Sequence, residues 1–253
     1  MEQITGKLLD KKYFIFDIDG TLVDSMEMWN TIDQVAILRA SGEFVDTEDV
    51  KTIRDSVIYG EDNLGGNIYE AFYAELIALF HLNMTVEEYK DSRRELEKRL
   101  SIEEVNFKPG AGEFLQILKM LGKKIGIATT TTKGQIDIYS NQNVKMKKIV
   151  SLQKVADALV TCHDVTFKKP HPEAYFKVVE LLGANPEECV VFEDSLPGVM
   201  AAKEAGLDVV AVFDKSAENE QEFIAQLADY QVESFDEIIK ILGLESLQEK
   251  INY

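Results

Sequence analysis

Cysteine, histidine and proline are scarce in this chain, which excludes several kinds of protein. Its 253 residues include two cysteines, three histidines and five prolines. Cys162 and Cys189 form no CxxC pair, so neither a disulfide framework nor the spacing of a zinc site is present. The histidines form no recognisable triad with a serine or cysteine nucleophile. Two unpaired thiols favour the reducing cytosol, so we expect a cytoplasmic protein.

Long apolar runs and a basic excess are also missing. No stretch of about 18 apolar residues occurs, and the first residues show no apolar region behind a basic start, so we expect no membrane span or secretion signal. The formal net charge is −18. Proteins that bind nucleic acid or anionic membranes carry clustered Lys and Arg, so we expect neither as a partner. A small anionic substrate would need a metal ion or a few placed lysines.

What is present is typical of an ordinary globular protein, with 45% apolar and 28% charged residues. The length exceeds the roughly 100 to 200 residues of a typical domain, so we expect one domain with a large insertion, or two domains. Short apolar runs predict strands at residues 13–18, 124–128, 158–161, 189–192 and 208–213.

Helical patterns alternate with these runs, and they occupy residues 112–121, 174–182 and 199–205. Strand alternating with helix predicts an α/β fold, with a Rossmann-like parallel sheet. Residues 25–107 differ, because they contain long helical patterns and no convincing buried strand. We therefore predict an inserted α-helical cap over 25–107 and a catalytic core from 1–24 and 108–253, whose end, residues 220–253, should be helical.

Two carboxylates flank Ile18 at the end of the first predicted strand. The two-residue period of an extended chain sends the side chains of Asp17 and Asp19 to one side. Asp and Gly are also common in turns, so the DxDG pattern alone leaves an ordinary solvated turn open. A second acidic pair, Glu193-Asp194, ends another predicted strand, and its alternative is an N-cap of the next helix. In parallel sheets, ligands bind beyond these carboxyl ends.

Four separated motifs together resemble one known family. They are FDIDGTLVDS at residues 16–25, KIGIAT ending at Thr129, the lysine pair of FKKPHPEAY, and Glu193-Asp194. This combination resembles the haloacid dehalogenase superfamily, in its phosphatase and phosphomutase branch with a helical cap, similar to β-phosphoglucomutase-like enzymes. The resemblance spans most of the core, whereas the cap matches only in length and helical character.

The resemblance implies roles for the four acidic residues. Asp17 would be the nucleophile that forms an acyl phosphate, and Asp19 the general acid and then base. Two unit charges about 4 Å apart repel by roughly 4 kcal/mol at an effective dielectric of 20, so a phosphate dianion needs a cation there. Carboxylates are ligands that Mg²⁺ prefers. Asp17 and Asp194 would bind Mg²⁺ through side chains and Asp19 through its carbonyl, with Glu193 beside them.

The phosphate-binding residues also follow from the resemblance. The hydroxyl of Thr129 and the neighbouring backbone N–H groups, including Thr130, would hold the phosphoryl oxygens. Lys169 would pair with the nucleophile and the phosphate, and Lys168 takes its place if the register differs by one. A strand end and a solvated surface charge are the alternatives for these positions. His171, between two prolines, reads as a loop residue.

The favoured activity is hydrolysis of a small phosphorylated metabolite, such as a sugar phosphate. A phosphomutase is the nearest alternative, but that branch carries a cap histidine where this chain has Trp29. Dehalogenases lack the second aspartate, and phosphonate cleavage would need a cap lysine in a matching motif. A non-catalytic metal-binding protein is a further alternative, although the acidic loop lacks the ligand ladder of an EF-hand.

The cap sets the substrate, and the sequence leaves both the substrate and the oligomeric state open. Trp29, with Met26 and Met28 beside it, lines the substrate cleft or is simply packing. Four further residues of the predicted cap are candidates for substrate contact: Arg54, Tyr59, Lys90 and Arg93.

Overall fold

The computed structural model describes residues 2–58 and 68–251, and the chain divides into two compact units. One unit consists of residues 1–24 and 106–253, and the other of residues 25–105. This division lies two residues before the predicted boundary after residue 107. Asn106–Phe107 form strand β3, which pairs antiparallel with β2, Val23–Asp24. Strands β2 and β3 are the segments where the chain leaves the first unit and returns to it. Because they pair with each other, β3 belongs with the first unit.

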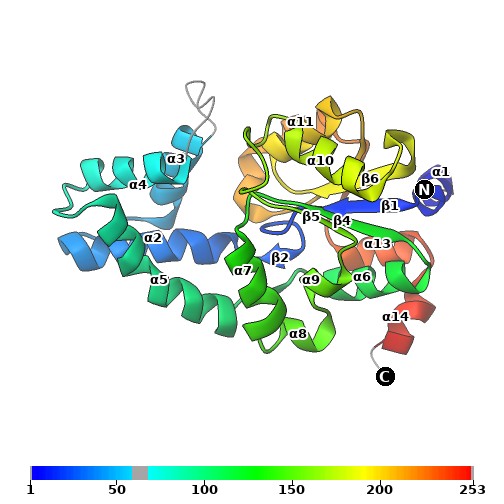
Figure 1. Cartoon of the computed structure of the whole chain (residues 1–253), viewed down its shortest axis with the longest axis horizontal. Helices are drawn as coiled ribbons and strands as arrows, with labels where there is room; N and C mark the ends of the chain where they lie inside the picture. The colour runs from blue at the N-terminus through cyan, green and yellow to red at the C-terminus, as the bar shows by residue number, and fades with distance from the viewer. Residues whose placement is uncertain (1, 59–67, 252–253) are drawn as a thin grey trace. The chain divides into compact units, whose positions relative to one another are not determined.

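The first unit is built on a parallel sheet (Figure 1). Within the described residues, its strand order is β5-β4-β1-β6-β7-β8, and every neighbouring pair is parallel. The strands are β1 (Tyr13–Phe16), β4 (Lys124–Ala128), β5 (Ala158–Val160), β6 (Cys189–Glu193), β7 (Asp208–Val212) and β8 (Tyr230–Val232). The predicted α/β class and Rossmann-like sheet are confirmed.

Strand β8 corrects the expectation that residues 220–253 are purely helical. Its three residues are too few for a two-residue period to be recognised in the sequence. It pairs only with β7, at the edge of the sheet. Helices α13 (Phe235–Ile241) and α14 (Glu245–Ile251) follow it, so the helical prediction holds for the rest of this segment.

Helices cover both faces of the sheet, which explains why the central strands are apolar throughout. Figure 1 shows α10 (Glu173–Leu182) and α11 (Leu196–Glu204) on one face, and α6 (Ala111–Met120) with α13 on the other. On the latter face, five aromatic residues pack with ring centroids 4.9–6.3 Å apart: Phe14, Phe16, Phe114, Phe192 and Phe235. This packing fixes the position of β1 beside β6.

Short helices, most of them not predicted, fill the remaining connections of the first unit. Between β4 and β5 the chain forms α7 (Lys133–Asp137), the π-helical turn η1 (Ile138–Gln142), α8 (Met146–Ile149) and α9 (Leu152–Val155). The others are α1 (Glu2–Asp10), η2 (Pro186–Glu188), η3 (Lys215–Glu220) and α12 (Gln221–Leu227).

The second unit is helical over its described residues. Its helices are α2 (Met26–Ser41), α3 (Thr47–Ile58), α4 (Ile68–Leu79) and α5 (Val86–Glu103). A capping box begins α5, because the Thr85 hydroxyl accepts from the Glu88 N–H while the Glu88 carboxylate accepts from the Thr85 N–H. Residues such as Ile37, Phe72 and Leu76 form a separate apolar core for this unit.

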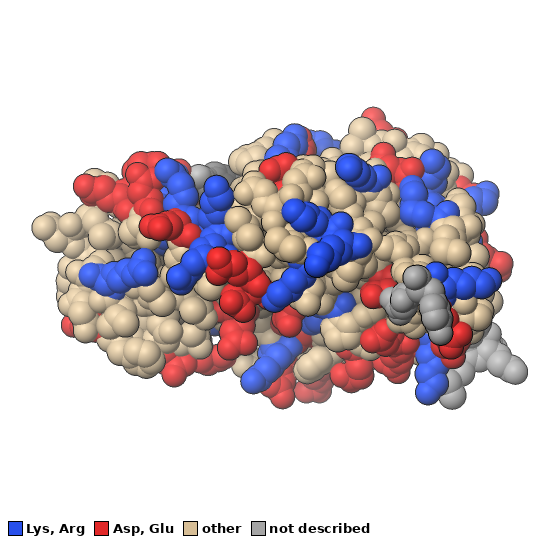
Figure 2. All heavy atoms as spheres, turned by 90° about the horizontal axis from the view of Figure 1, so that it is seen from below, with Lys and Arg blue, Asp and Glu red and all other residues tan. Residues whose placement is uncertain are grey.

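Surface charge and helix length bear on the expected partners. Figure 2 shows acidic and basic side chains interleaved across the face in view. With a formal net charge of −18, that face offers no continuous basic surface of the kind that binds nucleic acid. Among the described helices, we find none both long and apolar enough to span a bilayer.

Candidate functional site

Three buried carboxylates converge at the carboxyl ends of adjacent strands. Asp17 follows β1, and its N–H donates to the Phe192 carbonyl at 3.1 Å. Glu193 ends β6 and Asp194 follows it. One carboxylate oxygen from each of Asp17, Glu193 and Asp194 lies within 4.8 Å of the others, and all three residues are buried. The sheet therefore brings together acidic residues separated by more than half of the chain.

Lys169 lies against this cluster. Its Nζ donates to Asp17 Oδ1 at 2.8 Å, to Glu193 Oε1 at 2.5 Å and to the Ala128 carbonyl at 3.0 Å. The side chain is buried, and burial opposes its charge, but Asp17 and Glu193 outweigh that effect and raise the pKa of Lys169 above its ordinary value. The lysine is therefore a fixed ammonium beside the nucleophile candidate, and the alternative of a solvated surface charge is wrong.

The cluster carries more negative charge than Lys169 can balance. Burial raises the pKa of Asp17 to about 7, against the lowering effect of Lys169, and Glu193 and Asp19 raise it further. Burial, followed by the charges of Glu193 and Asp17, raises the pKa of Asp194 well above its ordinary value. With one ammonium beside three buried carboxyl groups, ionisation of all three would leave uncompensated negative charge, so burial and repulsion favour the protonated forms of Asp17 and Asp194 until a cation binds.

Two glycines allow the backbone to approach these carboxylates. Gly20 has a φ of +84°, and a Cβ there would lie 2.1 Å from Asp194 Oδ2. A Cβ on Gly198, in the first turn of α11, would lie 2.1 Å from the Glu193 carboxylate. A side chain at either position would displace a carboxylate of the cluster, so the site depends on glycine at both.

Asp19 lies at the edge of the cluster and is held by two hydroxyl groups. Tyr139 donates to Asp19 Oδ1 at 2.9 Å, and the Thr131 hydroxyl donates to Asp19 Oδ2. Thr129 follows β4, is buried, and donates through its hydroxyl to Thr131 Oγ1 at 3.1 Å. Thr130 is half-buried between them. Asp19 and both predicted phosphate-binding threonines therefore stand at the same edge of the sheet as Asp17.

Comparison with known proteins identifies the family. Residues 11–206 match the sequence profile of the haloacid dehalogenase-like hydrolases. The chain belongs to this family. The match includes Asp17, Lys169 and Asp194, and it extends over more than half of the chain. The predicted family and the prediction that the chain is an enzyme are thereby confirmed.

Relatives of this hydrolase align along most of their length. It is 25% identical to the protein CbbY of Rhodobacter capsulatus over 209 residues, which are 80% of this chain and 85% of CbbY. It is 27% identical to hexitol phosphatase B of Escherichia coli K12 over 237 residues, 88% of this chain and 92% of the relative. Solved CbbY from Rhodobacter sphaeroides, in complex with phosphate, has the same fold, with a TM-score of 0.69, 23% identity and 89% and 95% coverage.

The residues present in this hydrolase fit a magnesium ion. Asp17, Glu193 and Asp194 supply the oxygen ligands that Mg²⁺ prefers, and their buried negative charge calls for a cation. The carboxylate of Asp19 accepts from Tyr139 and Thr131.

The alternative explanation of Glu193-Asp194 as a helix cap is only partly right. Ser195 is the N-cap of α11, and its hydroxyl accepts from the Gly198 N–H at 3.2 Å. Glu193 Oε2 accepts from the Asp194 N–H at 3.1 Å and from the Ser195 hydroxyl at 3.2 Å. Glu193 thus fixes the turn with one oxygen and binds Lys169 with the other, while Asp194 remains directed at the cluster.

Four site residues were not predicted from the sequence. The Thr21 hydroxyl donates to Asp194 Oδ1 at 2.6 Å, and the Tyr175 hydroxyl donates to Glu193 Oε1 at 2.6 Å. Thr131 and Tyr139 hold Asp19. Thr21 lies inside the FDIDGTLVDS motif, Thr131 lies two residues beyond KIGIAT, and Tyr175 ends FKKPHPEAY, so their positions could have suggested them. Tyr139 lies in a helical segment where an aromatic residue is ordinarily packing, and no signal distinguishes it.

Two further predictions concern the segment around Lys169. His171 is exposed, its Nδ1 accepts from the Glu173 N–H at 3.2 Å, and its ring lies 4.8 Å from that of Phe167. These are contacts of a loop residue, as expected. Lys168 is half-buried, and burial lowers its pKa. Since Lys169 contacts Asp17 directly, the structure favours the original register.

The candidate substrate contacts of the second unit have partners within that unit. Arg93 Nε lies 2.6 Å from Asp33 Oδ1, and Arg54 lies 3.5 Å from Asp33 Oδ2. Lys90 pairs with Glu87 at 2.9 Å. Tyr59 lies outside the described residues, and Trp29 is half-buried in α2. The two arginines serve the packing of this unit, which argues against assigning them to substrate.

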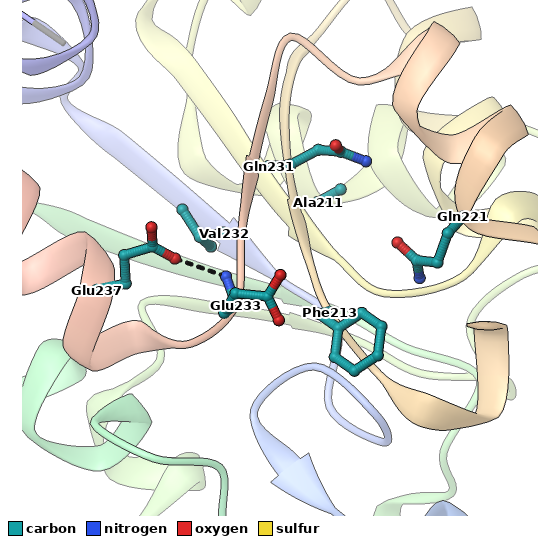
Figure 3. A pocket seen from close by; sticks show the side chains of 7 residues that line it. All are labelled: Ala211, Phe213, Gln221, Gln231, Val232, Glu233 and Glu237. Atoms are coloured by element: carbon teal, nitrogen blue, oxygen red, sulfur yellow. Dashed lines mark hydrogen bonds between the residues drawn. The ribbon is translucent and has the colours of Figure 1, made fainter.

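A surface hollow lies elsewhere, at the carboxyl ends of β7 and β8 (Figure 3). Its lining includes Phe213, Gln221 and Glu233. The Glu233 N–H donates to Glu237 Oε2 at 2.7 Å, as Figure 3 shows, so the Glu237 side chain stabilises the first turn of α13. None of the acidic cluster lines it. We therefore interpret the hollow as part of the turn that precedes α13, and not as a catalytic site.

Proposed function

We propose that this hydrolase is a Mg²⁺-dependent phosphatase that forms an aspartyl phosphate on Asp17. The observation that carries the proposal is the convergence of Asp17, Glu193 and Asp194 within 4.8 Å, with Lys169 bound to Asp17. A phosphoryl group placed there meets a nucleophile and a fixed ammonium. With a bound cation balancing the carboxylates, the site would accept an anionic group beside Asp17 and Lys169.

A small phosphorylated metabolite is the proposed substrate, with sugar phosphates as the favoured class. The name of the relative hexitol phosphatase B supports this class, and the alignment extends over 92% of that protein. The phosphomutase alternative is less well supported, because Trp29 stands where the mutase branch carries a cap histidine. We place the enzyme in the cytoplasm on the basis of its unpaired cysteines.

The first half-reaction transfers the phosphoryl group to the protein. A carboxylate oxygen of Asp17 attacks phosphorus, the bond from phosphorus to the substrate oxygen breaks, and Asp19 gives its proton to that leaving oxygen. Asp17, Asp194 and the Asp19 carbonyl, with Glu193 nearby, would hold Mg²⁺, which would supply the positive charge that allows two anions to meet. Lys169 and the donors of the Thr129–Thr130 segment orient the phosphoryl oxygens.

The second half-reaction releases phosphate. Asp19, now ionised, takes a proton from a water whose oxygen attacks phosphorus, and the bond from phosphorus to Asp17 breaks. Inorganic phosphate leaves, the Asp17 carboxylate is regenerated, and Asp19 again carries a proton. One carboxyl group therefore serves as acid and then base, which removes the need for a histidine.

Removing the nucleophile tests the proposal. Asp17→Asn keeps the size of the side chain but cannot form an acyl phosphate, so release of phosphate from para-nitrophenyl phosphate and from a panel of sugar phosphates should fall to background in Mg²⁺. Circular dichroism should be unchanged. Wild-type protein that hydrolyses none of these compounds would overturn the function, and turnover that persists in Asp17→Asn would remove Asp17 from its role.

A further inference from the structure

Tyr139 reaches Asp19 from an unusual backbone element. It lies in the π-helical turn η1, where the Asn143 N–H donates to the Ile138 carbonyl at 2.9 Å, five residues back. Such turns rotate the side chains of a helix out of the regular register and are frequent at functional sites. The ring of Tyr139 is completely buried, and its hydroxyl donates to Asp19 Oδ1 at 2.9 Å.

Thr131 binds the other oxygen of the same carboxylate. Its hydroxyl donates to Asp19 Oδ2 and accepts from the Thr129 hydroxyl at 3.1 Å. The Thr131 N–H donates to Thr129 Oγ1 at 3.2 Å. A hydrogen-bonded chain therefore connects the predicted phosphate-binding residue Thr129 to Asp19, and it runs entirely through the segment that follows β4.

These two donors determine the orientation of Asp19. An aspartate has two side-chain torsions, and a hydrogen bond to each carboxylate oxygen fixes both. Asp19 is only half-buried, so water could satisfy its oxygens without either hydroxyl. The hydroxyl groups therefore select one conformer rather than merely satisfy a buried group. A threonine hydroxyl can also turn and accept, so the contact with Thr131 survives protonation of Asp19.

We propose that Tyr139 and Thr131 are positioning residues that hold Asp19 where it can exchange protons with the leaving oxygen and with water. The inference rests on the proposed function and adds residues to it. General acid–base catalysis requires the side chain within hydrogen-bond reach of the transferred proton. Without these donors, Asp19 would sample other conformers, and both half-reactions would slow.

Substrates with different leaving groups separate positioning from a structural role. A para-nitrophenolate leaves without needing a proton, whereas an alkoxide, as from glycerol phosphate, needs the acid. The variants are Tyr139→Phe and Thr131→Val. Tyr230→Phe, at the far edge of the sheet, controls for loss of a tyrosine hydroxyl, and Thr131→Ser should restore the hydrogen bond to Asp19.

In Tyr139→Phe, kcat/KM for glycerol phosphate should fall by about tenfold or more, while kcat/KM for para-nitrophenyl phosphate changes by less than about threefold. Slower hydrolysis of the intermediate should appear as a burst of para-nitrophenol, and as phosphate bound to protein after a rapid acid quench. Thr131→Val should behave in the same way, Thr131→Ser should approach wild type, and Tyr230→Phe should match it.

An equal fall with both substrates, or no change with either, would overturn the positioning role. If circular dichroism shows that Tyr139→Phe does not fold, Thr131→Val is compared with Thr131→Ser instead. The ratio of kcat/KM for glycerol phosphate to kcat/KM for para-nitrophenyl phosphate then decides the question. Absence of wild-type turnover with either substrate would instead contradict the proposed function itself. The two failures are thus distinguished by the activity of the unmodified enzyme.

Discussion

The environment of Lys169 in the structure differs from the one that its residue type alone predicts. In the sequence it is one of 27 basic residues, and most lysines are solvated. In the fold its ammonium is buried and donates to Asp17, Glu193 and the Ala128 carbonyl. It is the only charge in the cluster of described contacts that offsets the three carboxylates, so its removal should affect both charge balance and catalysis.

Replacing this lysine should reduce activity far more than replacing its neighbour. Lys169→Met should lower kcat by about 100-fold or more, because a preorganised donor to the phosphoryl group is lost. Lys168→Met, the matched control in the same loop, should retain activity within about threefold of wild type. Steady-state release of phosphate measures both. Similar losses in the two variants would contradict the specific role of Lys169.

At the scale of elements, the loop that carries Lys169 is anchored by the next helix. Glu173, in the first turn of α10, accepts from the Thr166 N–H at 2.9 Å and from the Phe167 N–H at 2.8 Å, and Lys177 donates to it at 2.6 Å. The Lys177 ammonium first, and then the Phe167 N–H, lower the pKa of Glu173 to about 2. The anchor therefore depends on an ionised carboxylate.

This anchor predicts a pH-dependent stability. A carboxyl whose folded pKa lies below its ordinary value of 4.5 stabilises the fold fully above about pH 4.5 and loses that effect as the pH falls toward 2. Glu173→Gln should cost about 1 kcal/mol at pH 7, allowing for solvent screening, and the difference from wild type should shrink below pH 4.5. Urea unfolding at several pH values measures it.

Glu180→Gln provides the matched control for that measurement, because Glu180 is exposed on the same helix. It should differ little from wild type at any pH. A difference between wild type and Glu173→Gln that stays constant from pH 7 to pH 3 would show that the anchor does not depend on the charge of Glu173.

The second unit is held together by a buried ion pair. Asp33 is 1% exposed and lies between Arg93, at 2.6 Å, and the Tyr89 hydroxyl, at 3.1 Å. The Arg93 guanidinium also lies 4.6 Å from the Tyr73 ring and donates to the Tyr73 hydroxyl at 2.6 Å. The Asp33 carboxylate of α2 is therefore bound by α5, and α4 joins it through the contact of Tyr73 with Arg93.

Removing that carboxylate should destabilise this unit strongly. Asp33→Ala should cost about 3–5 kcal/mol, because breaking a buried pair leaves the guanidinium of Arg93 without its counter-charge. Glu95→Ala, exposed on α5, is the control and should cost less than about 0.5 kcal/mol. Thermal or urea unfolding would measure both. A cost below about 1 kcal/mol for Asp33→Ala would show that the pair adds little to the stability of this unit.

At the scale of the whole molecule, the acidic cluster couples cation binding to stability. Burial and mutual repulsion make ionisation of the three carboxyl groups costly in the folded state, and a bound cation relieves that cost. Any ligand that binds the folded state at about a hundredfold its Kd adds about 2.7 kcal/mol. The acidic site is therefore a place where the protein gives up stability for function.

Asp194→Asn separates these two effects. In EDTA this variant should unfold at about the same temperature as wild type, because the raised pKa of Asp194 favours its neutral form there and the Thr21 hydrogen bond can remain. Mg²⁺ should raise the Tm of wild type and of the exposed control Asp10→Asn, but not that of Asp194→Asn, which should also be inactive. Calorimetry with and without Mg²⁺ tests this. An equal rise in all three proteins would exclude Asp194 as a ligand.

The sequence by itself determined the parallel fold and the principal site residues, because both are written in local patterns. Apolar runs between helical patterns specify buried parallel strands, and carboxylates directly after such runs must stand at one edge of the sheet. Asp17, Asp19 and the Glu193-Asp194 pair could be placed for that reason, whereas the roles of Thr129 and Lys169 followed from the family resemblance. The short strands β3 and β8 could not be placed, since two or three residues carry no readable period.

Only the tertiary structure decided how those residues are held. Tyr139 and Tyr175 lie in helical segments, and their hydroxyls reach Asp19 and Glu193 because packing brings those segments to the sheet. Arg54 and Arg93 were candidates for substrate contact in the sequence, whereas in the structure both lie beside Asp33. A side chain's partner depends on distances across the chain, and no local pattern encodes those distances.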